Sequence, residues 1–297
     1  MTGVLCLLAY GAALAWVCPP LLDRLTRAGT SPRLSVAVWL TAIVVTAGVW
    51  LTAGIGLAAD LAGGHVTATP VRYCLDVVLA LHRLGWIGHL VLAGIMLAGL
   101  AISVVALGRI LRTLRVLSAR SRDHAHTAHL VGTAHEDVLV VASEHAAAYS
   151  VAGRPSAIVV TSGAVSTLED DELRAVLAHE RAHLRGRHPQ LLMVLTSLAT
   201  TLPGLPLVRA GAEAVGRLVE MSADDAAARR HGNQAVLSGL VAFSAGPFSD
   251  TAVLARAQRL VAPADRSVQL RHHLVLLATM AIMAAAPVAI LMLGHRV

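Results

Sequence analysis

Residues 168–184 read LEDDELRAVLAHERAHL, and this pattern predicts one amphipathic helix. Ser166 or Thr167 can cap its start, and Ser166 has capping-box spacing to Glu169. The acidic residues at 169–172 fall in the first turn, where the helix dipole favours negative charge. Aliphatic side chains recur at helical spacing along the rest of the stretch, so one face of the helix is predicted to be buried.

Two histidines of this helix have the spacing of metal ligands. His179 and His183 are four residues apart, hence one turn apart on the same face, and both imidazoles can reach one ion. Glu180 can take a proton from water in such a site and pass it to a leaving amine. This is the His-Glu-x-x-His pattern of zinc peptidases, and it predicts one Zn²⁺ ion with Glu180 as the catalytic base. The competing interpretation is two surface histidines and a solvated glutamate.

A catalytic zinc site needs a third protein ligand and an open fourth position. We predict Glu220 as this ligand, because Asp224 follows it on the same helical face and can hydrogen-bond the free nitrogen of a ligand histidine. Glu213 is a competing carboxylate, although no acidic residue lies four positions beyond it. His188 is a further rival, five residues after His183, and its side chain is expected to point away from the metal.

The composition indicates a membrane protein. The 297-residue chain is 56% hydrophobic and 14% charged, whereas soluble domains are about 45–50% apolar and about 25% charged. A disordered chain is excluded, and a polytopic membrane protein with a modest soluble part is expected. Segments of about 20 apolar residues cross a bilayer, and the four predicted spans are 4–22, 34–59, 85–107 and 274–294. The three cysteines indicate neither a disulfide framework nor a thiolate metal site.

The distribution of arginine predicts how the chain is oriented. Arginine is concentrated in the loops after the first and third predicted spans and before the fourth, whereas the loop after the second is neutral. The positive-inside rule then puts both termini outside and the segment 108–273 in the cytoplasm. The net charge of +6 is interpreted as a topology signal and not as a nucleic-acid footprint. We therefore predict a multi-pass protein of the cell membrane.

A fifth apolar stretch, at 189–208, is predicted not to cross the membrane. If it did, Glu220 would lie outside while His179 stayed inside, and the two could not share a metal. Pro203 and Pro206 also interrupt the stretch. We expect it to pack on the domain core, or to enter the bilayer and return.

Short runs at 138–142 and 157–161 are rich in β-branched residues, with a further run at 147–152 between them. They predict a small antiparallel sheet ahead of the active-site helix. An exposed edge strand at 149–152 could bind an extended substrate by strand addition. The alternative is a purely structural sheet.

The remaining histidines are placed outside the zinc site. His124, His126, His129 and His135 are interpreted as part of a solvated connector, with metal binding or pH sensing as the alternative. His231 could steady an oxyanion, and the alternative is the end of a surface helix.

The predicted fold is mostly α-helical and has four parts. Three transmembrane helices (1–107) lead through an Arg/His-rich connector (108–137) into a cytoplasmic α+β zinc-peptidase domain (138–273), and a fourth transmembrane helix (274–297) follows.

Three stretches resemble a known family. They are VVTSG at 159–163, DELRAVLAHERAH at 171–183, and the spaced residues Glu220, Ala223 and Asp224. Together with the predicted spans, they resemble the BlaR/MecR-type integral-membrane metallopeptidases. They are similar, more distantly, to HtpX and the CAAX-prenyl-protease group.

The resemblance implies a gluzincin-like zinc endopeptidase. His179, His183 and Glu220 match its metal ligands, Glu180 its general base, and Asp224 the acid that supports a ligand histidine. In that family the substrate is often a cytoplasmic transcriptional repressor, and self-cleavage can accompany activation. The chain stops just after its fourth predicted span, so no external penicillin-binding sensor is expected.

We therefore predict a membrane-embedded, zinc-dependent endopeptidase that cleaves a cytoplasmic or membrane-proximal protein in regulated proteolysis. No direct contact with nucleic acid is expected. One alternative is a quality-control protease of the HtpX kind, with broader substrates. Another is a non-enzymatic membrane receptor or scaffold with a vestigial site, against which the intact Glu180 argues.

Overall fold

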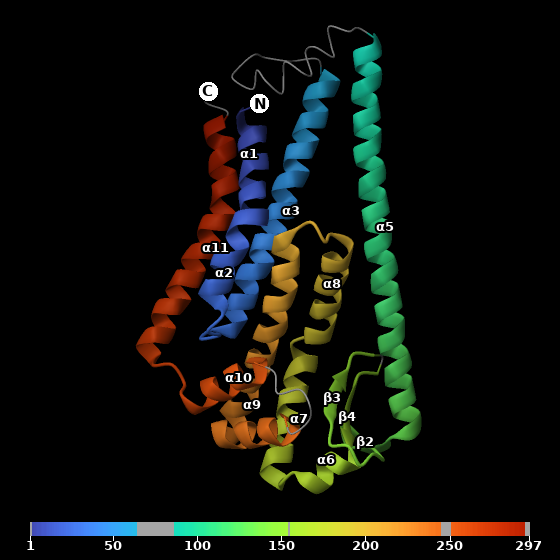
Figure 1. Cartoon of the computed structure of the whole chain (residues 1–297), viewed down its shortest axis with the longest axis vertical. Coiled ribbons are helices and arrows are strands. Elements are labelled where there is room, and N and C mark those ends of the chain that lie inside the picture. The colour runs from blue at the N-terminus through green and yellow to red at the C-terminus, as the bar shows by residue number, and fades with distance from the viewer. Residues whose placement is uncertain (1, 64–85, 154, 245–250, 295–297) are drawn as a thin grey trace.

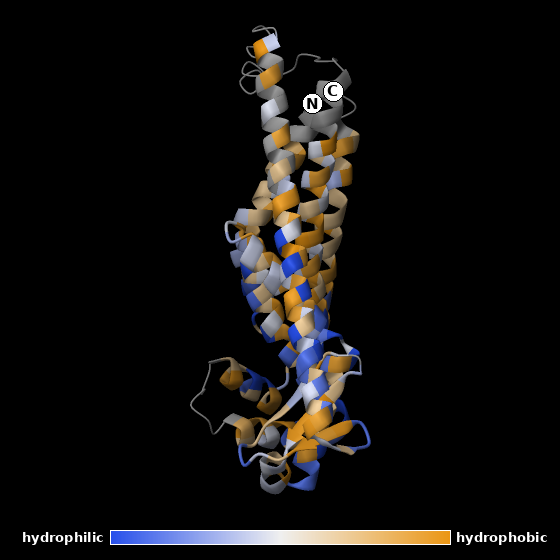
Figure 2. Cartoon of the chain, turned by 90° about the vertical axis from the view of Figure 1, so that its right-hand side faces the viewer, coloured by the Kyte–Doolittle hydropathy of each residue, from blue (hydrophilic) through white to orange (hydrophobic). Residues whose placement is uncertain are grey.

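The structure is a computed structural model that describes residues 2–63, 86–153, 155–244 and 251–294. Helices dominate these residues, and a four-stranded sheet lies near one end of the molecule (Figure 1). The prediction of a mostly α-helical chain is confirmed. Hydrophobic residues dominate the helices at the far end from the sheet, and hydrophilic residues gather in the half that holds it (Figure 2).

Among the described residues, three helical segments are long and apolar enough to cross a membrane. They are Cys6–Thr26, Pro32–Ile55 and Arg266–Met292, and they coincide with three of the four predicted spans. The first runs through α1 (Thr2–Ala12), the π-helical η1 (Ala13–Val17) and α2 (Cys18–Thr26), and the others lie in α3 (Pro32–Gly63) and α11 (Arg266–Gly294). α1, α3 and α11 pack against one another, and the start of α1 lies at the same end as the end of α11 (Figure 1).

The third predicted span falls on the first half of α5 (Trp86–Val131). Many side chains there lie outside the described residues, so this span stays a prediction. The second half of α5 covers most of the predicted connector, which is therefore helical. Ala125 and Ala128 of this segment are buried and pack against the sheet, so the connector is not wholly solvated.

The predicted antiparallel sheet is wrong in one respect, because the sheet is mixed. Its strands are β1 (Thr133–His135), β2 (Val138–Val141), β3 (Ala148–Val151) and β4 (Ala157–Thr161), in the order β1-β2-β4-β3. The β1–β2 and β3–β4 pairs are antiparallel, but β2 and β4 run parallel. All five residues of β4 are buried, so β4 takes a central position. β3 pairs with the outer edge of β4, and β2 pairs with the other edge of β4.

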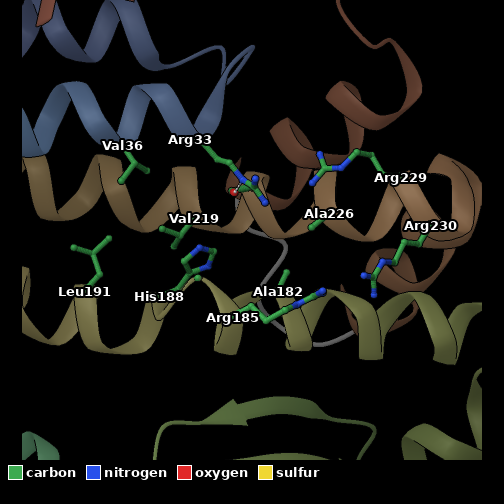
Figure 3. A pocket seen from close by; sticks show the side chains of 12 residues that line it. Arg33, Val36, Ala182, Arg185, His188, Leu191, Val219, Ala226, Arg229 and Arg230 are labelled. Carbon is green, nitrogen blue, oxygen red and sulfur yellow. Dashed lines mark hydrogen bonds between the residues drawn. The ribbon is translucent and has the colours of Figure 1, made fainter.

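The helices after the sheet build the frame of the site. They are α6 (Ser162–Thr167), α7 (Asp170–Arg185), α8 (His188–Thr201), α9 (Pro206–Ser244) and α10 (Thr251–Val261). α8 rises beside α9, the chain turns at residues 202–205, and α9 returns toward α7 (Figures 1 and 3). The apolar stretch at 189–208 therefore covers α8, the turn and the first residues of α9, and the rest of α9 returns the chain toward α7.

A buried hydrophobic cluster packs the helices of the site against the candidate membrane spans. Trp39 of α3 is fully buried, and its Nε1 donates a hydrogen bond of 3.0 Å to Oγ1 of Thr26 on α2. Val215 and Val219 of α9 belong to the same cluster and are also fully buried. Since α9 carries Glu220, the apolar helices hold one of the predicted metal ligands in place through direct packing.

Candidate metal centre

Helix α7 begins at a different cap from the one predicted. Glu169 is the N-cap residue, its side chain accepts from the backbone of Glu172, and the Glu172 carboxylate accepts from the Glu169 N–H at 3.0 Å. Ser166 and Thr167 cannot cap α7, because they end the separate helix α6 and their hydroxyls donate back to the Gly163 carbonyl. Acidic residues occupy the first turn of α7, as predicted.

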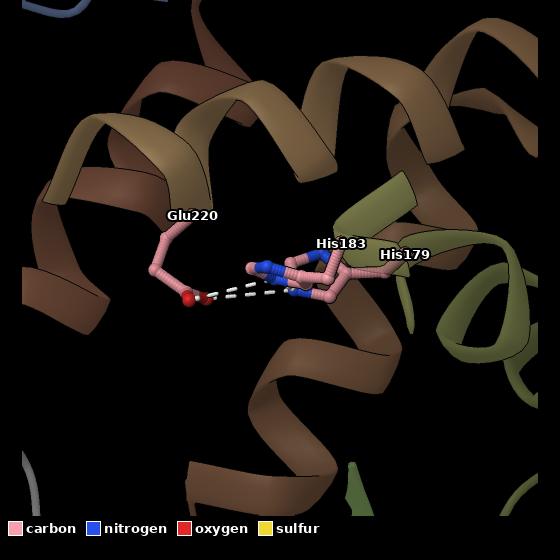
Figure 4. A group of neighbouring side chains, drawn as sticks. All are labelled: His179, His183 and Glu220. Atoms are coloured by element: carbon pink, nitrogen blue, oxygen red, sulfur yellow. Dashed lines mark hydrogen bonds and ion pairs between the residues drawn. The ribbon is translucent and has the colours of Figure 1, made fainter. Parts of the chain in front are cut away.

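The structure brings His179, His183 and Glu220 together (Figure 4). The two Nε2 atoms lie 3.0 Å apart. The Glu220 carboxylate from α9 lies 3.4 Å from His179 Nε2 and 3.5 Å from His183 Nε2. One ligand atom from each residue falls within 4.8 Å of the others. Two imidazole nitrogens and one carboxylate oxygen at this spacing fit a zinc ion with an open position for water.

Asp224 contacts the Nδ1 atom of His179. Its Oδ1 lies 3.0 Å from His179 Nδ1, one turn beyond Glu220 on α9, as the sequence spacing predicts. This contact keeps the proton on Nδ1 and leaves Nε2 free to face a metal. Burial alone would lower the pKa of His179, but hydrogen bonds to Asp224 and Glu220 raise it to about 9. A metal ion that binds Nε2 would therefore displace the proton which that nitrogen carries at pH 7.

Arg256 of α10 is a site residue that sequence analysis missed. Its Nε and Nη2 donate to the two carboxylate oxygens of Asp224 at 2.8 and 2.7 Å. Its Nη1 also lies 3.2 Å from Oε2 of Glu220. Burial would raise the pKa of Asp224, but the hydrogen bonds from Arg256 and His179 hold it well below its usual range. Arg256 therefore favours the charged form of Asp224 and, together with His179 and His183, lowers the pKa of Glu220.

His188 lies behind His183 and away from the cluster, as predicted. Its Nδ1 lies 3.0 Å from Nδ1 of His183, on the side of that ring opposite the Nε2 that faces Glu220. Burial lowers the pKa of His183 to about 4, so its ring is neutral at pH 7, which metal binding requires. The rival ligand Glu213 is exposed and lies outside the cluster.

Glu180 lies next to His179 on α7 and contacts the edge strand β3. Ser150 donates hydrogen bonds to it from its hydroxyl and its backbone N–H. Burial raises the pKa of Glu180, and the neighbouring His179 and Ser150 offset this only in part. A carboxylate with a raised pKa beside a metal site suits proton transfer near neutral pH. No sequence signal pointed to Ser150 itself, although the strand that carries it was predicted.

The other histidines are not brought to this cluster. His124, His126 and His129 lie on α5 and His135 on β1. His231 lies on α9, directly before the break at Gly232, and no described hydrogen bond or ion pair joins it to the site.

Comparison with protein families matches residues 115–285 to Peptidase family M48. This match covers more than half of the chain and includes α7, α9 and all the residues of the metal centre. The protein therefore belongs to peptidase family M48. The predicted membership of an integral-membrane metallopeptidase family is confirmed at this level.

The chain is also similar to a solved structure, the crystal structure of Ste24p from S. mikatae. The identity is 17%, the TM-score is 0.28, and the match covers 75% of this chain and 66% of that one. This chain thus matches slightly less than two thirds of the length of Ste24p. A likeness at this level carries no argument about substrate or mechanism.

Proposed function

We propose that this protein is a zinc-dependent endopeptidase that cleaves a cytoplasmic or membrane-proximal protein. The observation that carries the proposal is the convergence of His179, His183 and Glu220 on one point, with Glu180 beside it on the same helix. The donor set supports a single zinc ion. Zinc in such a site supplies Lewis-acid chemistry, because it polarises the scissile carbonyl and lowers the pKa of water toward about 7.

Glu180 is the proposed general base. Its carboxylate takes the proton from the attacking water and then gives it to the amine that leaves. The raised pKa of Glu180 supports the first step, because the group is a better base than an exposed glutamate. The hydrogen bonds from Ser150 orient the carboxylate while it is charged.

Strand β3 is the proposed docking edge for the substrate. It is the last strand in the sheet order, and it lies against α7. Tyr149 in this strand is 47% exposed. A peptide that adds to β3 as a further strand would pass close to Ser150 and thus to Glu180.

The proposed site faces the cytoplasm, at the membrane surface. Support comes from the arginine-rich loops on one side of the predicted spans and from the α8–α9 hairpin, which keeps Glu220 on the same side as His179. A cytoplasmic substrate, such as a transcriptional repressor in regulated proteolysis, follows from this placement.

The test is a comparison of protein N-termini in cells that carry the wild-type protein or the Glu180→Gln variant. We expect new N-termini, from cytoplasmic or membrane-proximal proteins, that are present only with the wild type. One dominant substrate would support regulated proteolysis, whereas many damaged membrane proteins would favour quality control. Identical N-termini in the two strains, with both proteins present at equal levels, would contradict the proposed activity.

A further inference from the structure

A cavity that none of the proposed metal ligands lines lies where α3, α7, α8 and α9 meet (Figure 3). Its volume is about 550 Å³. Four arginines line it, and neither Asp nor Glu does. These residues are Arg33 of α3, Arg185 of α7, and Arg229 and Arg230 of α9. A cavity with four guanidinium groups and no acid in its wall suits an anion.

Within the described part of the chain, no carboxylate forms an ion pair with these four arginines. By contrast, the nearby Arg217, Arg256 and Arg259 each form an ion pair with an aspartate. Arg33 donates only to the Ser222 hydroxyl, at 3.4 Å, and Arg185 only to a backbone carbonyl of its own helix. Asp225 is near enough to Arg229 to interact with it, but the direct partner of Asp225 is Arg259, at 2.7 Å.

The cavity has an apolar end and a basic end. Figure 3 shows Val36 and Leu191 at one end and Arg229 and Arg230 at the other, with Arg33 and Arg185 between them. The apolar end follows α3 into its candidate span, which begins at Pro32. The basic end therefore lies where phospholipid headgroups are found if α3 crosses the membrane.

We propose that this cavity binds the headgroup of an anionic phospholipid, with the phosphate on the arginines and the first part of the acyl chains along Val36 and Leu191. The polarity of the cavity favours an amphiphile over a fully polar anion. Four arginines present forked donors that match phosphate oxygens, which a zwitterionic headgroup uses less well because it carries its own cation. The lipid would hold the α8–α9 hairpin and α7 against the membrane surface, next to His188 and the metal centre.

The test measures lipid binding and needs no peptidase activity. Short-chain phosphatidylglycerol, phosphatidylcholine and inorganic phosphate are titrated into the full-length protein in neutral detergent, and bound lipid is counted by native mass spectrometry. The double variant Arg33→Gln/Arg229→Gln removes two charges from the cavity wall. The control Arg120→Gln/Arg187→Gln removes two exposed charges that do not line it, so the two variants have equal net charge.

We expect the wild type to bind one phosphatidylglycerol in preference to phosphatidylcholine. The cavity variant should bind it about tenfold or more weakly, and the control should stay within about twofold of the wild type. All four cavity arginines are exposed, so the variants should fold. Ala226→Leu keeps every arginine but fills the cavity, and it should also weaken phosphatidylglycerol binding.

Three outcomes would overturn the proposal. Equal weakening in the cavity and control variants would show diffuse charge attraction. Competition by millimolar inorganic phosphate as effective as that by the lipid would show a site for free anions. Displacement of the lipid by an acidic peptide, with tighter binding of that peptide, would assign the cavity to a protein ligand. The peptidase proposal does not depend on the result, because it rests on the metal centre.

Discussion

His179 Nδ1 lies 3.0 Å from Oδ1 of Asp224, and the Asp224 side chain is completely buried. Arg256 donates two hydrogen bonds to the same carboxylate. The orientation of His179, a proposed metal ligand on α7, thus depends on Asp224 of α9 and Arg256 of α10. The first two predictions test this chain of contacts.

Replacing Asp224 by Asn should weaken zinc binding by about 10–100-fold, because the amide supports the Nδ1 proton of His179 less well. The measurement is zinc affinity by competition with a chromophoric chelator. Asp225→Asn is the matched control, since Asp225 is adjacent and ion-paired to Arg259 but makes no contact with a proposed ligand. Equal zinc affinity in the wild type and the Asp224→Asn variant would show that the contact has no role in metal binding.

Replacing Arg256 by Ala should destabilise the protein by about 3–5 kcal/mol, because it leaves the buried Asp224 carboxylate without its main partner. Arg256→Ala should therefore unfold at a clearly lower temperature than the wild type in the same detergent. Arg174→Ala, which breaks the exposed pair with Asp171, should cost less than about 1 kcal/mol. If both variants unfolded at the wild-type temperature, Arg256 would not stabilise the site.

Replacing Glu180 by Gln should leave zinc affinity unchanged and reduce peptide cleavage by about 10²–10⁴-fold, because the amide cannot accept the proton. The rate is measured on a substrate identified from the cellular N-termini. Asp171→Asn, on the exposed start of α7, should cleave at the wild-type rate. A Glu180→Gln variant as active as wild type would assign the proton transfer to another group.

The α8–α9 hairpin predicts that residues before and after it lie on the same side of the membrane. Arg187 directly precedes α8, Gln234 lies on α9 just after its break at Gly232, and both are exposed. In a chain whose native cysteines are replaced by Ala, Arg187→Cys and Gln234→Cys should react with an impermeant thiol reagent only in inverted vesicles. Labelling of the two positions from opposite sides would contradict the return of the hairpin.

Much of the metal centre could be predicted from local sequence. Helical periodicity alone places His179 and His183 on one face, and the four-residue spacing of Glu220 and Asp224 identifies the second half of the site. Arg256 could not be found in this way. It lies 32 residues beyond Asp224, on a separate helix, so its contact depends on how α9 and α10 pack.

The fold was less predictable where partners are distant in sequence. Alternation and β-branching located three strands, but the parallel pairing of β2 with β4 depends on β3 taking the outer edge of β4. The connector looked polar because of its arginines and histidines, yet small residues such as Ala125 give it a face that packs on the sheet. Residues 189–208 are apolar enough to resemble a span, but the turn at 202–205 ends α8 and α9 then returns the chain toward α7.

The most direct test of the central claim is the zinc content of the natively purified protein, measured by elemental analysis for the wild type, Glu180→Gln and His183→Ala. One zinc per chain is expected in the wild type and in Glu180→Gln, because Glu180 is not a proposed ligand. His183→Ala should retain almost none. A wild type without zinc, or a His183→Ala variant with a full complement, would contradict the assignment of His179, His183 and Glu220 as the metal ligands.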